Sequence, residues 1–201
     1  IDVLGFDACN MGTLEVIYEL RNSASFIIGS PHSLPSDGSN YTLLLEELNS
    51  RLHDPETFAK GFPIGYAQAY GNTVFENDIL MVYDTQKITQ IVESSELNSF
   101  FNNIQSRSQN DIYDLLISTL RYNVNGGYKY IDLIDFFTQL DEKDLETNLK
   151  NAIFSVNSER KYISLYFPMS SYGFTASYIN SLDFTKLHGW DEFLSDYYNN
   201  K

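Results

Sequence analysis

The chain begins with the residues Ile1-Asp-Val-Leu-Gly-Phe-Asp-Ala-Cys-Asn-Met-Gly12, which include the only cysteine of the sequence. The apolar run of Ile1–Asp7 predicts a buried strand, and Gly12–Asn22 has the apolar spacing of an amphipathic helix. Ser25–Ser30, with Phe26, Ile27 and Ile28, predicts a second buried strand. A strand, a helix and a strand within about thirty residues indicate a right-handed parallel βαβ unit, so we expect an α/β fold with a covered, mostly parallel sheet.

Cys9 directly follows the first predicted strand. Open α/β sheets place their reactive crevices at the carboxyl ends of strands, so this position suits a nucleophile. Asp7 and Cys9 are two residues apart, and strand alternation predicts that their side chains share one cleft. Two simpler interpretations remain open. In the first, Cys9 is a small buried hydrophobic residue. In the second, Asp7 is a carboxylate that accepts hydrogen bonds from N–H groups of the following turn.

The rest of the sequence predicts further helices and strands within one domain, residues 1–201, without a linker or a repeat. The loop Ser30–Ser39 contains Pro31, Pro35 and Asp37-Gly38 and is too rich in turn residues for regular structure. We expect Pro63 to kink or split its helix. The predicted helices are Tyr41–Leu52, Pro55–Tyr70, Ile88–Ile104, Ile112–Leu120, Ile131–Leu140, Leu145–Phe154 and Trp190–Tyr197; the predicted strands are Asp78–Asp84 and Tyr162–Pro168, with a turn at Asn123–Gly127.

The composition excludes several classes of protein. Thirteen basic and 27 acidic residues give a net charge of −14, which is the wrong sign for binding nucleic acid or an anionic membrane. Such a charge attracts cationic peptides, but it also simply keeps a surface soluble. No apolar run approaches the roughly 20 residues that span a bilayer. One cysteine excludes an internal disulfide framework.

A cysteine nucleophile needs a histidine that takes its proton and later protonates the leaving group. The sequence contains His32, His53 and His188. His53 and His188 are best interpreted as surface or capping residues, and His32 lies on the loop after the second strand, where nothing local orients its ring. None of the three is a persuasive general base. Asp37, by itself, is an ordinary turn residue.

Several segments resemble the clostripain family of cysteine peptidases, in order along the chain. Phe6-Asp-Ala-Cys-Asn-Met-Gly12 and the following Glu15-Val-Ile-Tyr-Glu-Leu20 resemble its active-site block. The later segments that match are Pro35-Ser-Asp-Gly-Ser-Asn-Tyr41, Tyr130-Ile-Asp-Leu-Ile-Asp-Phe136, Ile163-Ser-Leu-Tyr-Phe-Pro168 and Trp190-x-x-Phe193-Leu194-x-x-Tyr197. The resemblance covers nearly the whole chain.

The resemblance implies a caspase-like α/β/α sandwich that hydrolyses peptide bonds after Arg or Lys. Cys9 matches the nucleophile of the family, and Asp7 and Asp37 match acidic positions that line its primary specificity pocket. Two carboxylates suit one guanidinium or ammonium group, because a buried cation needs paired acceptors. The family also implies a bacterial, often exported protease. Some members require calcium, but Asp141-Glu-Lys-Asp144 is better interpreted as charges at a helix start than as a calcium loop.

The histidine of the family lies upstream of the cysteine strand, and no matching segment occurs in this sequence. Clostripain-like zymogens cut themselves between histidine and cysteine, and the two chains stay associated. We therefore expect this chain to be the heavy-chain portion, incomplete and inactive without a histidine-bearing light chain. The alternative is a peptidase-like module that binds basic peptides without hydrolysing them, or a structural α/β domain with an inert thiol. Arg or Lys preference and the natural substrate stay open.

Overall fold

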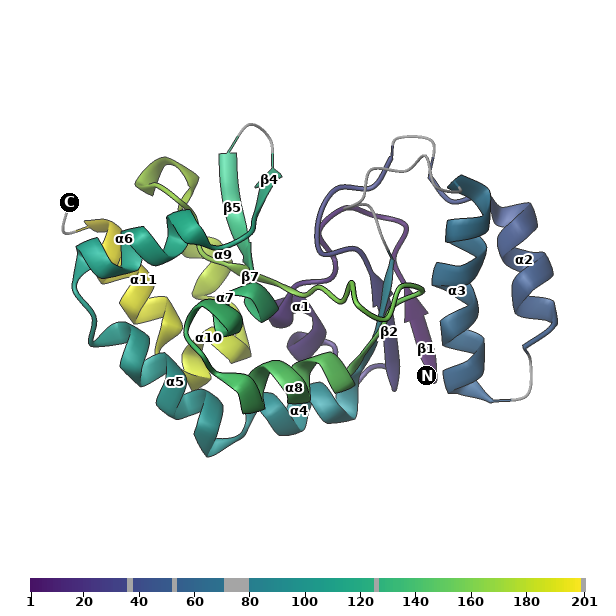
Figure 1. Cartoon of the computed structure of the whole chain (residues 1–201), viewed down its shortest axis with the longest axis horizontal. Coiled ribbons are helices and arrows are strands. Elements are labelled where there is room, and N and C mark those ends of the chain that lie inside the picture. Colours follow the sequence, from purple (N-terminus) through teal and green to yellow (C-terminus); the bar gives the residue numbers. More distant parts are fainter. Residues whose placement is uncertain (36–37, 52–53, 71–79, 125–126, 200–201) are drawn as a thin grey trace.

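The structure, a computed structural model, describes residues 1–35, 38–51, 54–70, 80–124 and 127–199. Strands and helices alternate in its first third, and helices dominate the remainder (Figure 1). The elements are β1 Val3–Gly5, α1 Leu14–Glu19, β2 Phe26–Gly29, α2 Tyr41–Asn49, α3 Pro55–Tyr70, β3 Met81–Asp84, α4 Thr85–Val92, α5 Ser95–Gln105, α6 Gln109–Ser118, β4 Arg121–Val124, β5 Gly127–Asp132, α7 Leu133–Gln139, α8 Lys143–Asn151, β6 Ile153–Phe154, β7 Ser164–Tyr166, the 3₁₀ turn η2 Ser171–Gly173, α9 Ala176–Ile179, α10 Asp183–Leu187 and α11 Trp190–Asn199.

The predicted βαβ unit is confirmed, since β1 and β2 pair in parallel with Val3 opposite Phe26. The described strands form two sheets, one of order β1-β2-β3-β6 and one of order β4-β5-β7. A parallel bridge between Thr13 and Ser164 connects the segment after Cys9 to the second sheet.

Side chains alternate between the two faces of the four-stranded sheet. Ile27, Met81 and Tyr83 point into the main core, whereas Ile28 and Val82 belong to a second, smaller cluster. Helix α3 covers the smaller cluster, and helices such as α1 and α4 cover the other face (Figure 1). The sheet is therefore enclosed between helical layers, as an α/β/α sandwich requires.

The expectation of a mostly parallel sheet is wrong. β3 runs antiparallel to β2, and β6 runs antiparallel to β3. One crossover helix returns a chain to the opposite end of a sheet and gives a parallel strand. Here two helices, α2 and α3, lie side by side as a hairpin (Figure 1), with Leu44 facing Gly65 and Leu48 facing Gly61. The second helix brings the chain back to the end of the sheet that it left, so β3 enters in reverse.

Several predicted boundaries also differ. The predicted helix Ile88–Ile104 is two helices, because Ser94 accepts a hydrogen bond from the N–H of Leu97 and starts α5. The predicted helix Ile131–Leu140 begins at Leu133, after β5, and Asp132 caps it. The helix expected at Leu145–Phe154 ends at Asn151 and is followed by β6. α3 continues through Pro63 as one helix.

Candidate active site

Cys9 lies in the turn after β1, and its side chain is exposed. The backbone N–H of Leu34 donates a hydrogen bond of 3.3 Å to Sγ, and the carbonyl oxygen of Leu34 lies 3.9 Å from the same sulfur. Among the described residues, these are the hydrogen-bond contacts of the thiol. The loop after β2 therefore orients the sulfur while leaving it accessible to a substrate.

The backbone of the Cys9 turn is tied to the end of β2. The N–H of Asn10 donates to the carbonyl of His32 at 2.9 Å, and the N–H of Gly12 donates to that of Ser30 at 2.8 Å. Asn10 has a φ of +58°, in the left-handed region that asparagine tolerates better than most residues. Gly12 has no room for a side chain, since a Cβ would lie 2.3 Å from the Tyr83 hydroxyl and 2.7 Å from the backbone nitrogen of Pro31. These constraints define the path of the turn.

Asp7 is exposed, and three hydrogen bonds from Ser39 and from Tyr41 at the start of α2 hold its carboxylate. The Tyr41 hydroxyl donates to Oδ2 at 2.6 Å, the Ser39 hydroxyl donates to Oδ1 at 3.1 Å, and the Ser39 N–H donates to Oδ2 at 3.4 Å. The Tyr41 hydrogen bond is the main cause that lowers the pKa of Asp7 below its ordinary value. The carboxylate is thus kept charged beside the thiol turn.

Both predicted side chains contact the segment of residues 34–41, although not through strand alternation. β1 ends at Gly5, so Asp7 and Cys9 lie in the turn that follows it. Asp37 lies outside the described residues, as does His53. Its neighbour Gly38 has a φ of +66°, and a Cβ built there would lie 3.3 Å from Asp7 Oδ2. Gly38 and Ser39 therefore lie directly beside Asp7.

The two described histidines are engaged elsewhere. The ring of His32 is buried, stacks on Tyr122 with centroids 5.2 Å apart and lies 3.1 Å from the carbonyl of Ser33 through Nδ1. Burial lowers the pKa of His32 to about 4. His188 is also buried and stacks on Phe101, and burial lowers its pKa as well. His188 is the C-cap of α10, which confirms the capping interpretation, but the surface interpretation is wrong because its ring packs between Phe101 and Phe184.

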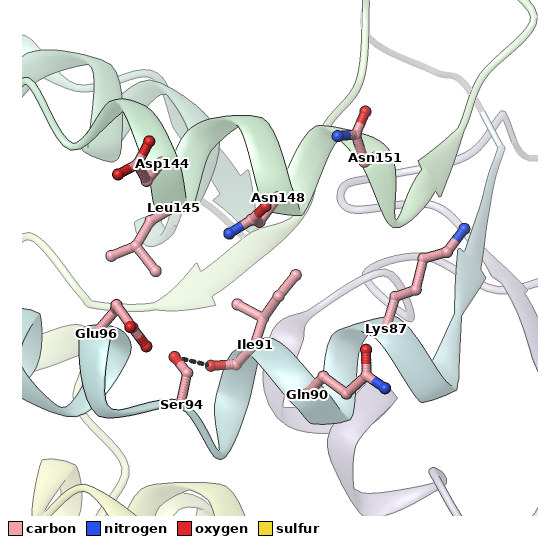
Figure 2. A pocket seen from close by; sticks show the side chains of 9 residues that line it. All are labelled: Lys87, Gln90, Ile91, Ser94, Glu96, Asp144, Leu145, Asn148 and Asn151. Atoms are coloured by element: carbon pink, nitrogen blue, oxygen red, sulfur yellow. Dashed lines mark hydrogen bonds between the residues drawn. The ribbon is translucent and has the colours of Figure 1, made fainter.

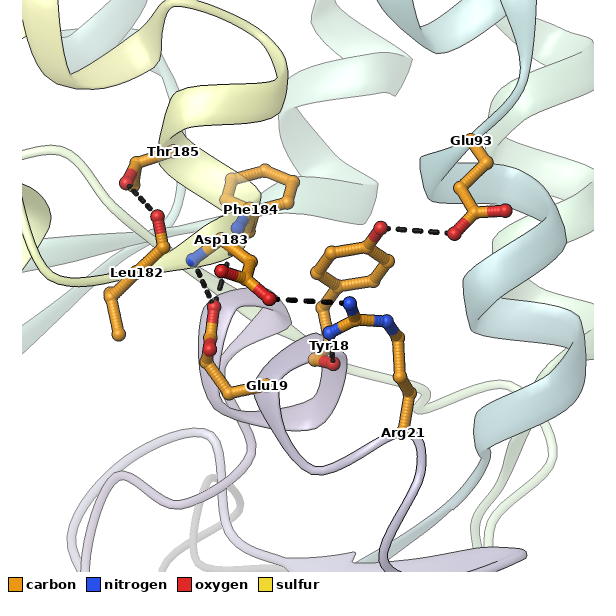
Figure 3. Close-up of polar contacts among 8 residues, drawn as sticks. All are labelled: Tyr18, Glu19, Arg21, Glu93, Leu182, Asp183, Phe184 and Thr185. Atoms are coloured by element: carbon orange, nitrogen blue, oxygen red, sulfur yellow. Dashed lines mark hydrogen bonds and ion pairs between the residues drawn. The ribbon is translucent and has the colours of Figure 1, made fainter.

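Helix α1, which follows the nucleophile turn, is fixed by polar contacts at its carboxyl end (Figure 3). Glu19 accepts hydrogen bonds from the backbone N–H groups of Asp183 and Phe184 at the start of α10. Tyr18 donates to Glu93 at 3.0 Å. Arg21 pairs with Asp183 at 3.3 Å and lies over the Tyr18 ring. α1 is therefore anchored to α4 and α10, and the turn before it gains a rigid support.

A pocket of about 380 Å³ lies between α4 and α8 (Figure 2). None of the predicted site residues lines it. α4 starts directly after Asp84, which pairs with Phe26 at the beginning of β2, whereas the Cys9 turn contacts the end of β2. The pocket is thus separate from the thiol. Its lining residues are Lys87, Gln90, Ile91, Ser94, Glu96, Asp144, Leu145, Asn148 and Asn151.

The residues that orient the site, Leu34, Ser39 and Tyr41, were not singled out from the sequence. Leu34 contributes only its backbone, for which the sequence contains no signal. Tyr41 is the last residue of the segment Pro35–Tyr41 that resembles the family, and its place in that segment is the sequence signal that could have identified it. Within the described part of the chain, no group of three or more His, Cys, Asp or Glu residues could hold a metal ion. None of the described helices is long and apolar enough to cross a membrane.

Solved structures that superpose on this chain include C11 proteases. The inactive zymogen of a C11 protease from Parabacteroides distasonis superposes with a TM-score of 0.67 at 17% identity, covering 92% of this chain and 58% of that one. A secreted C11 cysteine protease from Bacteroides thetaiotaomicron, in complex with an irreversible peptide inhibitor, gives 0.59 at 19% identity, covering 96% and 60%. A clostripain from Bacteroides thetaiotaomicron ATCC 29148, in complex with a peptide inhibitor, gives 0.60 at 16% identity, covering 94% and 87%. The fold is therefore that of the caspase-like cysteine proteases.

The chain belongs to the clostripain family, whose sequence profile matches residues 1–173. Members of this family are cysteine proteases. The resemblance seen in the sequence is thereby confirmed. The chain spans about three fifths of the length of the first two structural relatives. No curated protein sequence matches it significantly.

Proposed function

We propose that the chain is the nucleophile-bearing part of a cysteine endopeptidase that cleaves after Arg or Lys. The Cys9 thiolate attacks the scissile carbonyl carbon and forms a tetrahedral oxyanion, for which the Cys9 backbone N–H is a candidate donor. Collapse to a thioester expels the amine, which takes a proton from a histidine of an upstream segment or partner chain. Water then hydrolyses the thioester and regenerates the thiol.

The single observation that carries this proposal is the geometry at Cys9. An inert cysteine is usually buried, but this thiol is exposed and oriented by the Leu34 N–H at 3.3 Å. The glycine at position 12 and the left-handed Asn10 maintain the turn that presents it.

A basic substrate side chain is supported by the acceptors that remain at Asp7. An ionised carboxylate offers about four lone-pair positions. Tyr41 and Ser39 occupy three of them, which leaves about one acceptor position for a guanidinium or ammonium group. One acceptor does not satisfy a guanidinium, so the proposal assigns the second carboxylate to Asp37. The inhibitor named with one structural neighbour, VLTK, has Lys as its last residue.

The proposal assigns the general base to an upstream segment or partner chain. Of the histidines that the structure describes, His32 and His188 have rings buried against aromatic side chains and are not available to Cys9. Among the described residues, β1 is at the edge of its sheet, where a further strand with the histidine could pair.

Two further points of the proposal, autoprocessing and export, rest on the structural neighbours alone. One neighbour is described as an inactive zymogen and another as secreted, which supports autoprocessing and export from a bacterial cell. Calcium dependence is also a proposal, taken only from the family.

The test is labelling of the native protein with an alkylating peptidyl ketone that ends in arginine, followed by intact and peptide mass spectrometry. We expect one adduct, on Cys9, together with a histidine-bearing polypeptide in the same sample. The matched probe ends in norleucine, which has a similar length and no charge. Labelling by this probe should be at least tenfold slower.

Two variants separate the steps of the proposal. Cys9→Ser should abolish labelling. Asp7→Asn should slow labelling by the arginine probe about 10- to 100-fold, the range for loss of a charged hydrogen bond, and should leave the norleucine probe unaffected. If Cys9 stays unlabelled although the histidine-bearing polypeptide is present and folded, the peptidase proposal fails. Retention of the arginine peptide without labelling would instead indicate a binding module.

A further inference from the structure

Glu15 is a fully buried acidic residue beside the proposed site, and the proposed reaction does not use it. It lies in the first turn of α1, six residues after Cys9. Its Oε1 accepts a hydrogen bond of 2.7 Å from the backbone N–H of Tyr166 in β7. Its Oε2 is buried and has no hydrogen-bond partner among the described residues. A buried, half-satisfied carboxyl group is costly and requires an explanation.

The groups that interact with Glu15 are neutral, and they include the side chain of Thr13, which favours the charged form only weakly against the effect of burial. Titratable side chains reach it from three elements: Tyr130 from β5, Tyr166 from β7 and Tyr178 from α9. The charged residues on the other neighbours of α1 make different contacts, since Glu93 of α4 binds Tyr18 and Asp183 of α10 binds Arg21. None of the ion pairs among the described residues includes Glu15. Burial raises its pKa from 4.5 to about 7.

Glu15 is part of a seam between the nucleophile turn and the second sheet. The Ser164 N–H donates to the Gly12 carbonyl at 3.1 Å, and the Ser164 hydroxyl donates to the carbonyl of Pro31 at 2.9 Å. Two residues further along β7, Tyr166 donates to Glu15. β7 thus contacts the chain at two places that follow Cys9, the stretch from Gly12 into α1 and the residue Pro31 just after β2.

We propose that Glu15 is a positioning residue that holds the Cys9 turn and α1 against β7, and that it does so in its neutral, protonated form. Its carboxyl group supplies the acceptor for Tyr166, while a carboxylate at this position has no counter-charge. Opening of the seam hydrates Glu15 and lets it ionise, so opening becomes easier as the pH rises. The positioning role rests on the proposed peptidase function, whereas the protonated state of the seam does not.

The first test is amide hydrogen exchange of the Tyr166 N–H in the wild-type protein, corrected for the intrinsic pH dependence of exchange. A proton that is lost only on opening makes protection fall by about tenfold per pH unit between roughly pH 5 and 7, with a plateau above. Glu15→Gln, which keeps an oxygen acceptor without a charge, should remove this pH dependence. Glu93→Gln is the matched control and should leave it unchanged. Equal pH dependence in the wild type and in Glu15→Gln overturns the proposal.

The second test compares kcat and KM for an arginine peptide at pH 6, below the raised pKa of Glu15, with the complete protein that includes the histidine-bearing polypeptide. Glu15→Gln should keep kcat within about threefold of the wild type, whereas Glu15→Ala should lower kcat at least tenfold with little change in KM. If Gln is as defective as Ala, the ionised form is the working form and the proposal is overturned. If Ala does not fold, the Gln comparison and the exchange measurement still decide. If the wild-type protein shows no peptidase activity although the histidine-bearing polypeptide is present and folded with it, the proposed function is refuted, and Tyr166 exchange then tests the seam alone.

Discussion

Replacement of Gly12 by alanine should destabilise the protein strongly, although it adds one methyl group. The new Cβ would lie 2.3 Å from the Tyr83 hydroxyl, 2.7 Å from the Pro31 nitrogen and 2.8 Å from the carbonyl carbon of Ser30. Ordinary contact begins at 3.4 Å, so the closest pair must separate by about 1.1 Å. Two of the three atoms belong to the backbone, which cannot rotate away as a side chain could.

The expected loss of stability follows from the contacts that this separation breaks. Forcing an extra methyl group into a packed site typically costs about 1–3 kcal/mol. The same movement disrupts the hydrogen bonds from Gly12 N–H to Ser30 and from the Tyr83 hydroxyl to the carbonyl of Tyr162, each of which contributes about 1 kcal/mol. We therefore expect a loss of about 3 kcal/mol or more in the free energy of unfolding.

The assay is urea unfolding followed by circular dichroism, with comparison of midpoints at an unchanged m value. Gly5→Ala in β1 is the matched control. Its Cβ would meet Phe62 at 3.5 Å and Ile28 at 3.8 Å, which are ordinary contacts, so its stability should stay within about 1 kcal/mol of the wild type. A Gly12→Ala protein as stable as Gly5→Ala would refute the steric reasoning.

Three further predictions concern the site and its buried acids. Tyr41→Phe removes the main cause of the lowered pKa of Asp7, so the acid limb of kcat/KM for arginine peptides should move to higher pH; an unchanged limb contradicts the role of Asp7. His32→Phe keeps the stacking on Tyr122 and should leave Cys9 labelling within about threefold, whereas a hundredfold loss in a folded variant would identify His32 as the base. Burial raises the pKa of Asp132 from 3.8 to about 7, so the folded state keeps a proton that the unfolded chain releases, and stability falls across that window. Urea unfolding at pH 5 and pH 8 should therefore show that the stability of Asp132→Asn relative to the wild type rises by on the order of 2–3 kcal/mol between the two pH values, and an unchanged difference would refute this.

Local patterns in the sequence predicted the first βαβ unit, because Phe26, Ile27 and Ile28 form a short apolar run beside an amphipathic helix. The direction of β3 could not be predicted, since it depends on how α2 and α3 pack as a pair. The sequence of Tyr128–Asp132 is compatible with both a strand and a helix. The segment forms a strand because Tyr130 pairs with Tyr166 of β7.

The same distinction applies to the site. Cys9 and Asp7 could be located because they end an apolar run, and their roles stay predictions. The residues that contact Cys9 and Asp7 could not be predicted, because Leu34 lies 25 residues after Cys9, and Tyr41 lies 34 residues after Asp7. These contacts depend on the path of a loop with two prolines, for which no local periodicity exists.

The long-range contacts of α1 also determine when, during synthesis, the turn that carries Cys9 is fixed in its final position. Glu15 binds a residue 151 positions later, and Glu19 binds one 164 positions later. Contacts of such long range form late, because the intervening chain must first be made and closed into a loop. The helix behind Cys9 therefore receives its final support only after α10 has emerged from the ribosome. A nascent chain of this design exposes Cys9 early, but the contacts that support the helix behind it form only after the residues of α10 have been made.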